Sequence, residues 1–162
     1  MMSRPRLRSI SATVVAGTLL VLVSATPSWA APPVSGGGSG AVGSDQVTSV
    51  RQAGANRIVE RELTGTMSGT LSGAFSEEVR GVVHPDGTVT FQGTLVFTGT
   101  VDSCGTGTLT ARVQGRGQAV PPVTDATVQV VNQSANTVPV TGHGTVQQSG
   151  SSLTYSITYS CH

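Results

Sequence analysis

The sequence predicts an all-β protein, a small up-and-down antiparallel β-barrel of six to eight strands. Over residues 63–117, apolar or small residues alternate with Thr, Ser and Gln, and a period of two places successive side chains on opposite faces of a strand. Short turn sequences rich in Gly, Pro and Asp separate the alternating segments. No segment after residue 30 shows the period of an amphipathic helix.

A closed barrel is favoured over an open sheet because closure removes the exposed strand edges that promote aggregation. Many positions in the inward phase are Gly, which suits the sharp strand coiling of a small barrel. A two-layer sandwich is the alternative architecture.

Residues 1–30 have the features of a secretory signal peptide. Three Arg residues form a basic start, residues 10–23 form an apolar run, and small residues at the −3 and −1 positions fit cleavage after Ala30. The run is shorter than the roughly 20 apolar residues that a transmembrane helix needs. The sequence therefore predicts a secreted, extracellular protein with no membrane span after cleavage.

Cleavage after residue 30 leaves 132 of the 162 residues, which suits one domain. The chain has no Lys, and without the three Arg of the signal peptide six Arg stand against eight acidic residues, a formal charge of −2. A basic surface for nucleic acid or for an anionic membrane is therefore not expected.

Residues 31–56 are expected to form a disordered linker ahead of a barrel domain at residues 57–162. The linker is rich in Gly, Ser and Pro, with the run Gly-Gly-Gly-Ser-Gly at 36–40. It has few large apolar side chains to offset the entropy lost on ordering.

The clearest hairpin is expected between residues 70–83 and 88–101. The intervening His-Pro-Asp-Gly at 84–87 forms a turn because Pro presets φ, Asp bonds back to the backbone and Gly accepts positive φ. Residues 58–69 extend beyond this pairing. We therefore expect the long first segment to bend near Gly69 or Gly73 and its front half to pair with another strand.

The rest of the chain continues the alternation with further strands. A tight connection at 102–105 precedes them, and a Pro pair and two polar turns separate them. The expected strands are residues 106–117, 126–130, 138–146 and 153–160.

The two Cys residues are expected to form a disulfide, as is usual in an exported protein. In an up-and-down meander, Cys104 and Cys161 both fall at the same end of the barrel. They can therefore meet without rearrangement, and the bond would stabilise the fold by about 4 kcal/mol in the chain-entropy model.

Five large side chains share the inward phase and are candidates to line a cavity for a small apolar ligand. In a barrel this small, the alternative is that these side chains simply fill the interior. The candidates are Phe91, Leu95, Phe97, Tyr155 and Tyr159.

Glu77 continues the inward phase of Phe75 and Val79. A buried carboxyl group at a barrel mouth would have a raised pKa and could be functional. The alternative is a change of register before the turn, which would leave Glu77 in solvent.

The sequence contains no recognisable catalytic or metal motif. It has no Gly-x-Ser-x-Gly, and no spacing of His, Cys, Asp or Glu encodes a metal site. We interpret His84 as a turn residue, His143 as outward-facing and His162 as terminal. No catalytic residue, metal or cofactor is expected.

Hydroxyl rows are expected on the outer surface. Such rows can bind glycans, including those of a cell wall, but Thr is also common on solvated strands by propensity. The rows comprise Thr88, Thr90, Thr106, Thr108, Thr110, Thr154, Ser156 and Thr158.

Several short patterns resemble bacterial secreted domains of unknown function that share the allene oxide cyclase-like barrel, related in shape to calycins and dirigent proteins. The resemblance covers residues 56–159. It implies an eight-stranded or similar barrel and transfers no catalytic residue, because none of the cyclase's site positions matches a residue here. The patterns are Asn56–Glu60, Thr-Gly-Thr and Ser-Gly-Thr within 64–70, His-Pro-Asp-Gly at 84–87, Phe-Gln-Gly at 91–93, Phe-Thr-Gly-Thr-Val-Asp at 97–102 and Gly-Thr-Gly-Thr-Leu at 105–109.

The leading hypothesis is a secreted, non-enzymatic barrel that binds a small apolar ligand or serves a structural role at the cell envelope. One alternative is an isomerase or cyclase acting on an apolar substrate. A second is a glycan-binding adhesion module.

Overall fold

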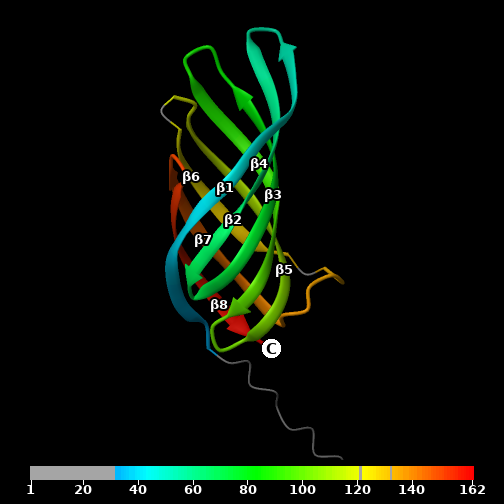
Figure 1. Ribbon diagram of the computed structural model, residues 1–162, viewed down its shortest axis with the longest axis vertical. Helices are drawn as coiled ribbons and strands as arrows, with labels where there is room; N and C mark the ends of the chain where they lie inside the picture. Colours follow the sequence, from blue (N-terminus) through cyan, green and yellow to red (C-terminus); the bar gives the residue numbers. More distant parts are fainter. Residues whose placement is uncertain (1–31, 121, 132) are drawn as a thin grey trace, which may run out of the picture.

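The computed structural model describes residues 32–120, 122–131 and 133–162. Its strands form a closed antiparallel barrel in which each strand pairs with its neighbours in the sequence and β1 pairs with β8 (Figure 1). The predicted up-and-down barrel is confirmed, and the predicted signal peptide lies outside the described residues. The strands are β1 (Val34–Ala53), β2 (Asn56–Gly69), β3 (Leu71–Val83), β4 (Thr88–Val101), β5 (Gly105–Gln118), β6 (Val123–Val130), β7 (Val140–Ser149) and β8 (Ser152–Cys161).

The β3–β4 hairpin forms in the predicted register, from the Leu71–Val101 pair to the Val83–Val89 pair. Its turn uses the expected chemistry, since Gly87 has φ 83° and the Asp86 carboxylate accepts a hydrogen bond from the Thr88 N–H at 2.9 Å.

The predicted linker at residues 31–56 is wrong for most of its length, because residues 34–53 form strand β1. Its Gly residues act as packing positions rather than as a tether. A Cβ atom on Gly38 would lie 2.6 Å from the Tyr155 hydroxyl oxygen, so only Gly lets the ring cross β1 here. Hydrogen bonding to both β2 and β8 supplies the stabilisation that the composition did not reveal.

The bend expected near Gly69 or Gly73 lies at Gly69, and it is a tight hairpin between two strands. β2 ends at Gly69, whose φ is 103°, and β3 begins two residues later. β2 pairs with β3 on one side and with β1 on the other, so the extra partner that residues 58–69 required is the segment assigned to the linker.

The chain between β6 and β7 folds along the first half of β5 instead of extending β7. The side-chain oxygen Oδ1 of Asn136 accepts a hydrogen bond from the Thr110 N–H at 2.9 Å, and the Thr137 hydroxyl accepts one from the Thr108 N–H at 2.8 Å. Val138, expected in a strand, lies in this loop and is buried in the core. Thr110, expected on the outer surface, is consequently buried.

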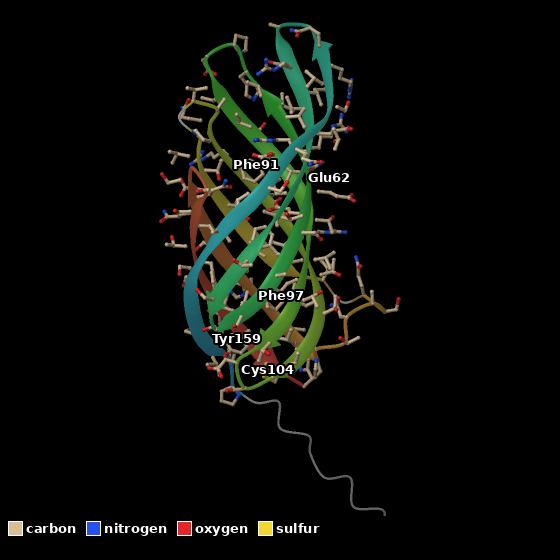
Figure 2. The ribbon with its side chains drawn as sticks, in the orientation of Figure 1. Glu62, Phe91, Phe97, Cys104 and Tyr159 are labelled. Carbon is tan, nitrogen blue, oxygen red and sulfur yellow. A yellow bond between two sulfur atoms is a disulfide. The ribbon has the colours of Figure 1, made fainter. Side chains whose placement is uncertain are left out.

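The barrel has two different ends. We call the end with the β2–β3 and β4–β5 turns the closed end, and the end with the β1–β2, β3–β4 and β7–β8 turns the open end. Figure 2 shows Phe91 towards the open end, Phe97 below it and Tyr159 close to the closed end. We call the parts of the barrel next to these two ends the closed half and the open half. The most deeply buried large side chains, Phe97 and Val101, are 0% and 1% exposed, and they belong to the closed half.

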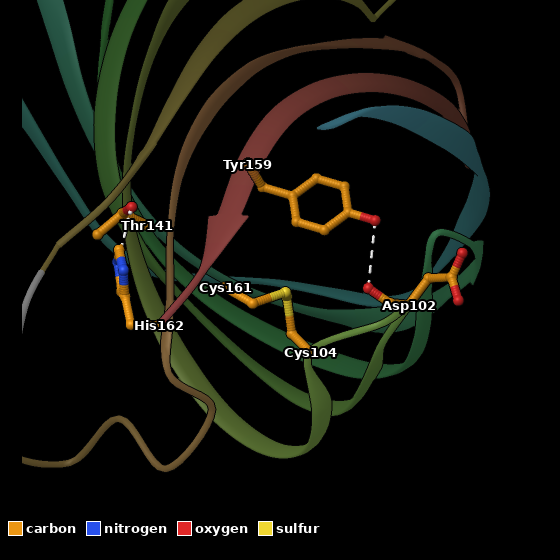
Figure 3. The surroundings of a disulfide bond; sticks show 6 residues. All are labelled: Asp102, Cys104, Thr141, Tyr159, Cys161 and His162. Carbon is orange, nitrogen blue, oxygen red and sulfur yellow. Dashed lines mark hydrogen bonds between the residues drawn. A yellow bond between two sulfur atoms is a disulfide. The ribbon is translucent and has the colours of Figure 1, made fainter. Parts of the chain in front are cut away.

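The predicted disulfide between Cys104 and Cys161 is confirmed, and it joins the β4–β5 turn to the end of β8 (Figure 3). Beside it, the Tyr159 hydroxyl donates a hydrogen bond to the Asp102 carbonyl oxygen at 3.2 Å. The disulfide and the Tyr159 hydrogen bond therefore both connect the β4–β5 turn to β8.

The described residues include no helix that is long and apolar enough to cross a membrane.

Candidate functional site

The interior of the open half is hollow. A cavity of about 580 Å³ extends from the barrel mouth towards the packed core, and its walls are mostly apolar. Its mouth lies between the β1–β2 hairpin, the β3–β4 hairpin, the β5–β6 connection and the β7–β8 turn. The wall residues on the inward faces are Val42, Val59, Leu63, Met67, Phe75, Glu77, Val79, Gly81, Phe91, Leu95, Val113, Ala126, Val128, Val146 and Leu153.

The six sequence-predicted lumen residues divide between the two halves. Phe91, Leu95 and Glu77 line the large cavity. Phe97, Tyr155 and Tyr159 belong to the packed half, where the remaining void is only about 50 Å³, well below the roughly 300 Å³ of a typical ligand pocket. For these three residues the arrangement is the alternative given above, in which the side chains fill the interior.

Tyr155 illustrates why the packed half cannot receive a ligand. Its hydroxyl accepts a hydrogen bond from the Leu71 N–H at 2.7 Å and donates one to the Ser68 carbonyl oxygen at 3.0 Å. These bonds anchor the ring to both sides of the β2–β3 turn. Burial raises the pKa of the Tyr155 hydroxyl, so it stays protonated near neutral pH.

Glu77 is the one acidic side chain on the inward face of β3. The register of β3 with β2 and β4 is unbroken, and it places Glu77 between Leu63 on one side and Leu95 on the other. A change of register that would move Glu77 into solvent does not occur. Burial in these apolar surroundings raises the pKa of the Glu77 carboxyl group to about 7.

The other charged residues of the cavity wall come from β1 and β2. Arg61 Nε donates a hydrogen bond to Asp45 Oδ1 at 2.9 Å, and the same two side chains form an ion pair. Arg57 is exposed near the tip of the β1–β2 hairpin. Among the described side chains, none makes a hydrogen bond or an ion pair with Glu77, so the carboxyl group faces the cavity without a protein partner.

β1 and the start of β2 also form part of the cavity wall, which was not expected from the sequence. Val42, Asp45 and Val47 come from the segment that was assigned to the linker, and Arg57 and Arg61 come from the beginning of β2. The available signal was the surplus length of β2, which needed an upstream partner to satisfy its second edge.

The His residues and the outer hydroxyl rows do not form a reactive centre. His84 Nε2 lies 3.5 Å from Thr90 Oγ1, and His162 Nε2 lies 3.0 Å from Thr141 Oγ1. His143 is exposed on β7. Within the described ranges, no three His, Cys, Asp or Glu side chains converge to hold a metal ion.

Two members of the outer hydroxyl rows, both on β5, contact Thr residues of β4. Thr100 and Thr106 hydroxyls are 2.8 Å apart, and those of Thr98 and Thr108 are 3.5 Å apart. All three Phe and both Tyr side chains belong to the interior. The described outer surface therefore offers hydroxyl groups without an aromatic ring on which a sugar could stack.

Comparison with known proteins gives no match, either to a family model or to a curated protein sequence.

Proposed function

We propose that this chain is a secreted β-barrel that binds a small apolar molecule in its open half, without converting it. The observation that carries the proposal is the cavity of about 580 Å³ with predominantly apolar walls. Ligand pockets usually measure about 300 to 1,000 Å³ and combine apolar walls with a few polar groups. The packed closed half gives such a pocket a rigid base.

Export is part of the same proposal. Disulfides persist mainly in oxidising compartments, and the Cys104–Cys161 bond joins two distant parts of the chain. The basic and apolar character of residues 1–30 supports the same localisation.

The structure offers a direct way to fill the cavity by mutation. Gly81 lies on its wall, and a Cβ atom there would meet its nearest neighbour, Val89 Cγ1, at an ordinary 3.5 Å. The longer side chain of Gly81→Leu would therefore extend into the cavity without displacing backbone. Val82→Leu provides the matched control, since Val82 is the next residue and lies in the opposite phase.

The test is titration with N-phenyl-1-naphthylamine, an uncharged probe whose fluorescence increases in apolar surroundings. We expect saturable binding to the wild-type protein with one site per chain. Gly81→Leu should weaken binding at least about tenfold, equivalent to roughly 1.4 kcal/mol, whereas Val82→Leu should bind like wild type. Absence of saturable binding, or equal binding by Gly81→Leu, would contradict the proposal and favour a structural role at the cell envelope.

A second candidate function is isomerisation or cyclisation of an apolar substrate, and Glu77 favours it. A carboxyl group with a pKa of about 7 is suited to donate or accept a proton near neutral pH. The distinguishing measurement is mass and chromatographic analysis of a bound molecule after prolonged incubation. An altered product that disappears with Glu77→Gln, while binding persists, would establish turnover.

A further inference from the structure

We propose that Glu77 is the recognition group of the cavity and that the ligand is a lipophilic amine. Its ammonium group would pair with the Glu77 carboxylate while its hydrocarbon part fills the apolar space around it. This inference rests on the proposed ligand-binding function and names the class of ligand that the same cavity would take.

The position of Glu77 provides the first argument. It lies opposite Leu63 and Leu95 on the adjacent strands, and both Leu side chains are buried. An unpaired carboxylate among apolar groups is unfavourable, because the loss of water is not compensated. A cationic ligand offsets the desolvation of the carboxylate by forming an ion pair with it. A neutral ligand cannot do so, and the cavity should therefore select cationic ligands.

The distribution of the other charges provides the second argument. β1 contributes Asp45 to the cavity and β2 contributes Arg57 and Arg61, with Arg61 paired to Asp45. The described cavity residues of β4 to β8 and of their connections carry no charge. Glu77 is therefore the only charged side chain that β3 to β8 contribute to the described cavity wall. Because Asp45 is already paired to Arg61, the unpaired Glu77 carboxylate is the group that favours a cation over a neutral or anionic ligand of the same shape.

The shape of the cavity provides the third argument. The carboxyl group occupies one point on the wall, while Phe75, Val79, Phe91 and Val113 supply apolar surface on the same wall. This arrangement suits a molecule with one compact charge and an extended hydrocarbon part. A ligand with several polar groups would leave most of them without partners.

Proton linkage separates an amine from a neutral ligand. Burial raises the pKa of Glu77 to about 7, so the empty protein is partly protonated at neutral pH. An amine binds the ionised form, and its affinity should rise between about pH 5 and pH 8. A neutral ligand that expels water favours the protonated form, and its affinity should fall over the same interval.

The experiment compares decylamine, decan-1-ol and decanoate by displacement of N-phenyl-1-naphthylamine, with each compound kept below the concentration at which it aggregates or separates from solution. At about pH 8 we expect decylamine to bind at least about tenfold more tightly than decan-1-ol, with decanoate weakest. Glu77→Gln should remove the preference for the amine while retaining binding of the uncharged probe. Glu78→Gln is the matched control, because Glu78 is the neighbouring carboxylate on the exposed face of the same strand.

The result that would overturn the inference is equal binding of decylamine and decan-1-ol, or an amine affinity that falls as pH rises. Equal loss of amine binding in Glu78→Gln would likewise overturn it, by assigning the preference to general surface charge. If the uncharged probe still binds in either case, the proposed function stands and only the identification of the ligand class fails. If no probe binds to the wild-type protein, both fail.

Discussion

The closed and open halves of this barrel are built from the same strands but have opposite interiors. In the closed half, Phe97 and Val101 are almost completely buried, and a void of only about 50 Å³ remains. In the open half, the inward side chains leave about 580 Å³ unfilled. Inward and outward side chains alternate in the same way in both halves. The difference in unfilled volume therefore comes from the size of the inward side chains and from the position of each aromatic ring along the barrel axis. We infer that the closed half supplies stability and the open half supplies the binding site.

The largest expected effect comes from removing the covalent link of the closed end. Replacing both Cys104 and Cys161 by Ala opens a loop with a sequence separation of 57 residues. The free energy of unfolding should fall by about 4 kcal/mol in the chain-entropy model. Denaturant unfolding measures the loss, and probe binding at low temperature should persist. A stability equal to that of the wild-type protein would show that the disulfide is not the main fastening of this end.

Truncating one Phe in each half tests the comparison directly. Phe97→Ala should lower the free energy of unfolding by at least about 3 kcal/mol, because it creates a cavity in a packed core. Phe91→Ala should cost roughly half as much, because Phe91 already borders an existing cavity. Equal losses in thermal or denaturant unfolding would contradict the division into a packed and a hollow half.

Glu77 should make the stability of the open half depend on pH. The pKa of Glu77 is about 7 in the folded chain against an ordinary value of 4.5, so the folded state binds more protons than the unfolded state between these values. The stability contribution is present below about pH 4.5 and is lost as pH rises through 7. The loss should approach about 3 kcal/mol over this interval.

The measurement for Glu77 is denaturant unfolding at a series of pH values. Glu77→Gln should remove this slope, whereas Glu78→Gln should retain it, because Glu78 is exposed. A slope that persists unchanged in Glu77→Gln would place the responsible group elsewhere.

The smallest expected effect concerns the hydrogen bond beside the disulfide. Tyr159→Phe removes the donor to the Asp102 carbonyl oxygen and keeps the ring. We expect a loss of about 1 kcal/mol in the free energy of unfolding, with no change in probe binding. A change in affinity would mean that the closed end communicates with the cavity, contrary to the separation of the two halves.

Local chemistry made part of this structure predictable. The β3–β4 hairpin followed from alternation and from the Pro-Asp-Gly turn. The disulfide followed from strand direction alone, since every second connection returns to the same end. The inward phase of Glu77 was also visible, but whether the register continued as far as the turn was not.

Strand β1 was not predictable from its composition. Residues 36–40 have the composition of a flexible linker, and their order depends on two partners that lie far away in the sequence. Gly38 becomes a strand residue because the Tyr155 ring needs the space that a side chain would occupy. Composition measures the cost of ordering a segment but not the contacts that offset it.

The sequence by itself determined the all-β class, the alternation of inward and outward side chains and the chemistry of the main turn, because these depend on residues close together in the chain. The tertiary structure decided that β1 closes the barrel, that Phe97 fills its interior while Phe91 borders a cavity, and that Glu77 faces that cavity without a partner. Those outcomes depend on the stagger of paired strands around the barrel, and stagger is set by hydrogen bonds between residues that are distant in the sequence.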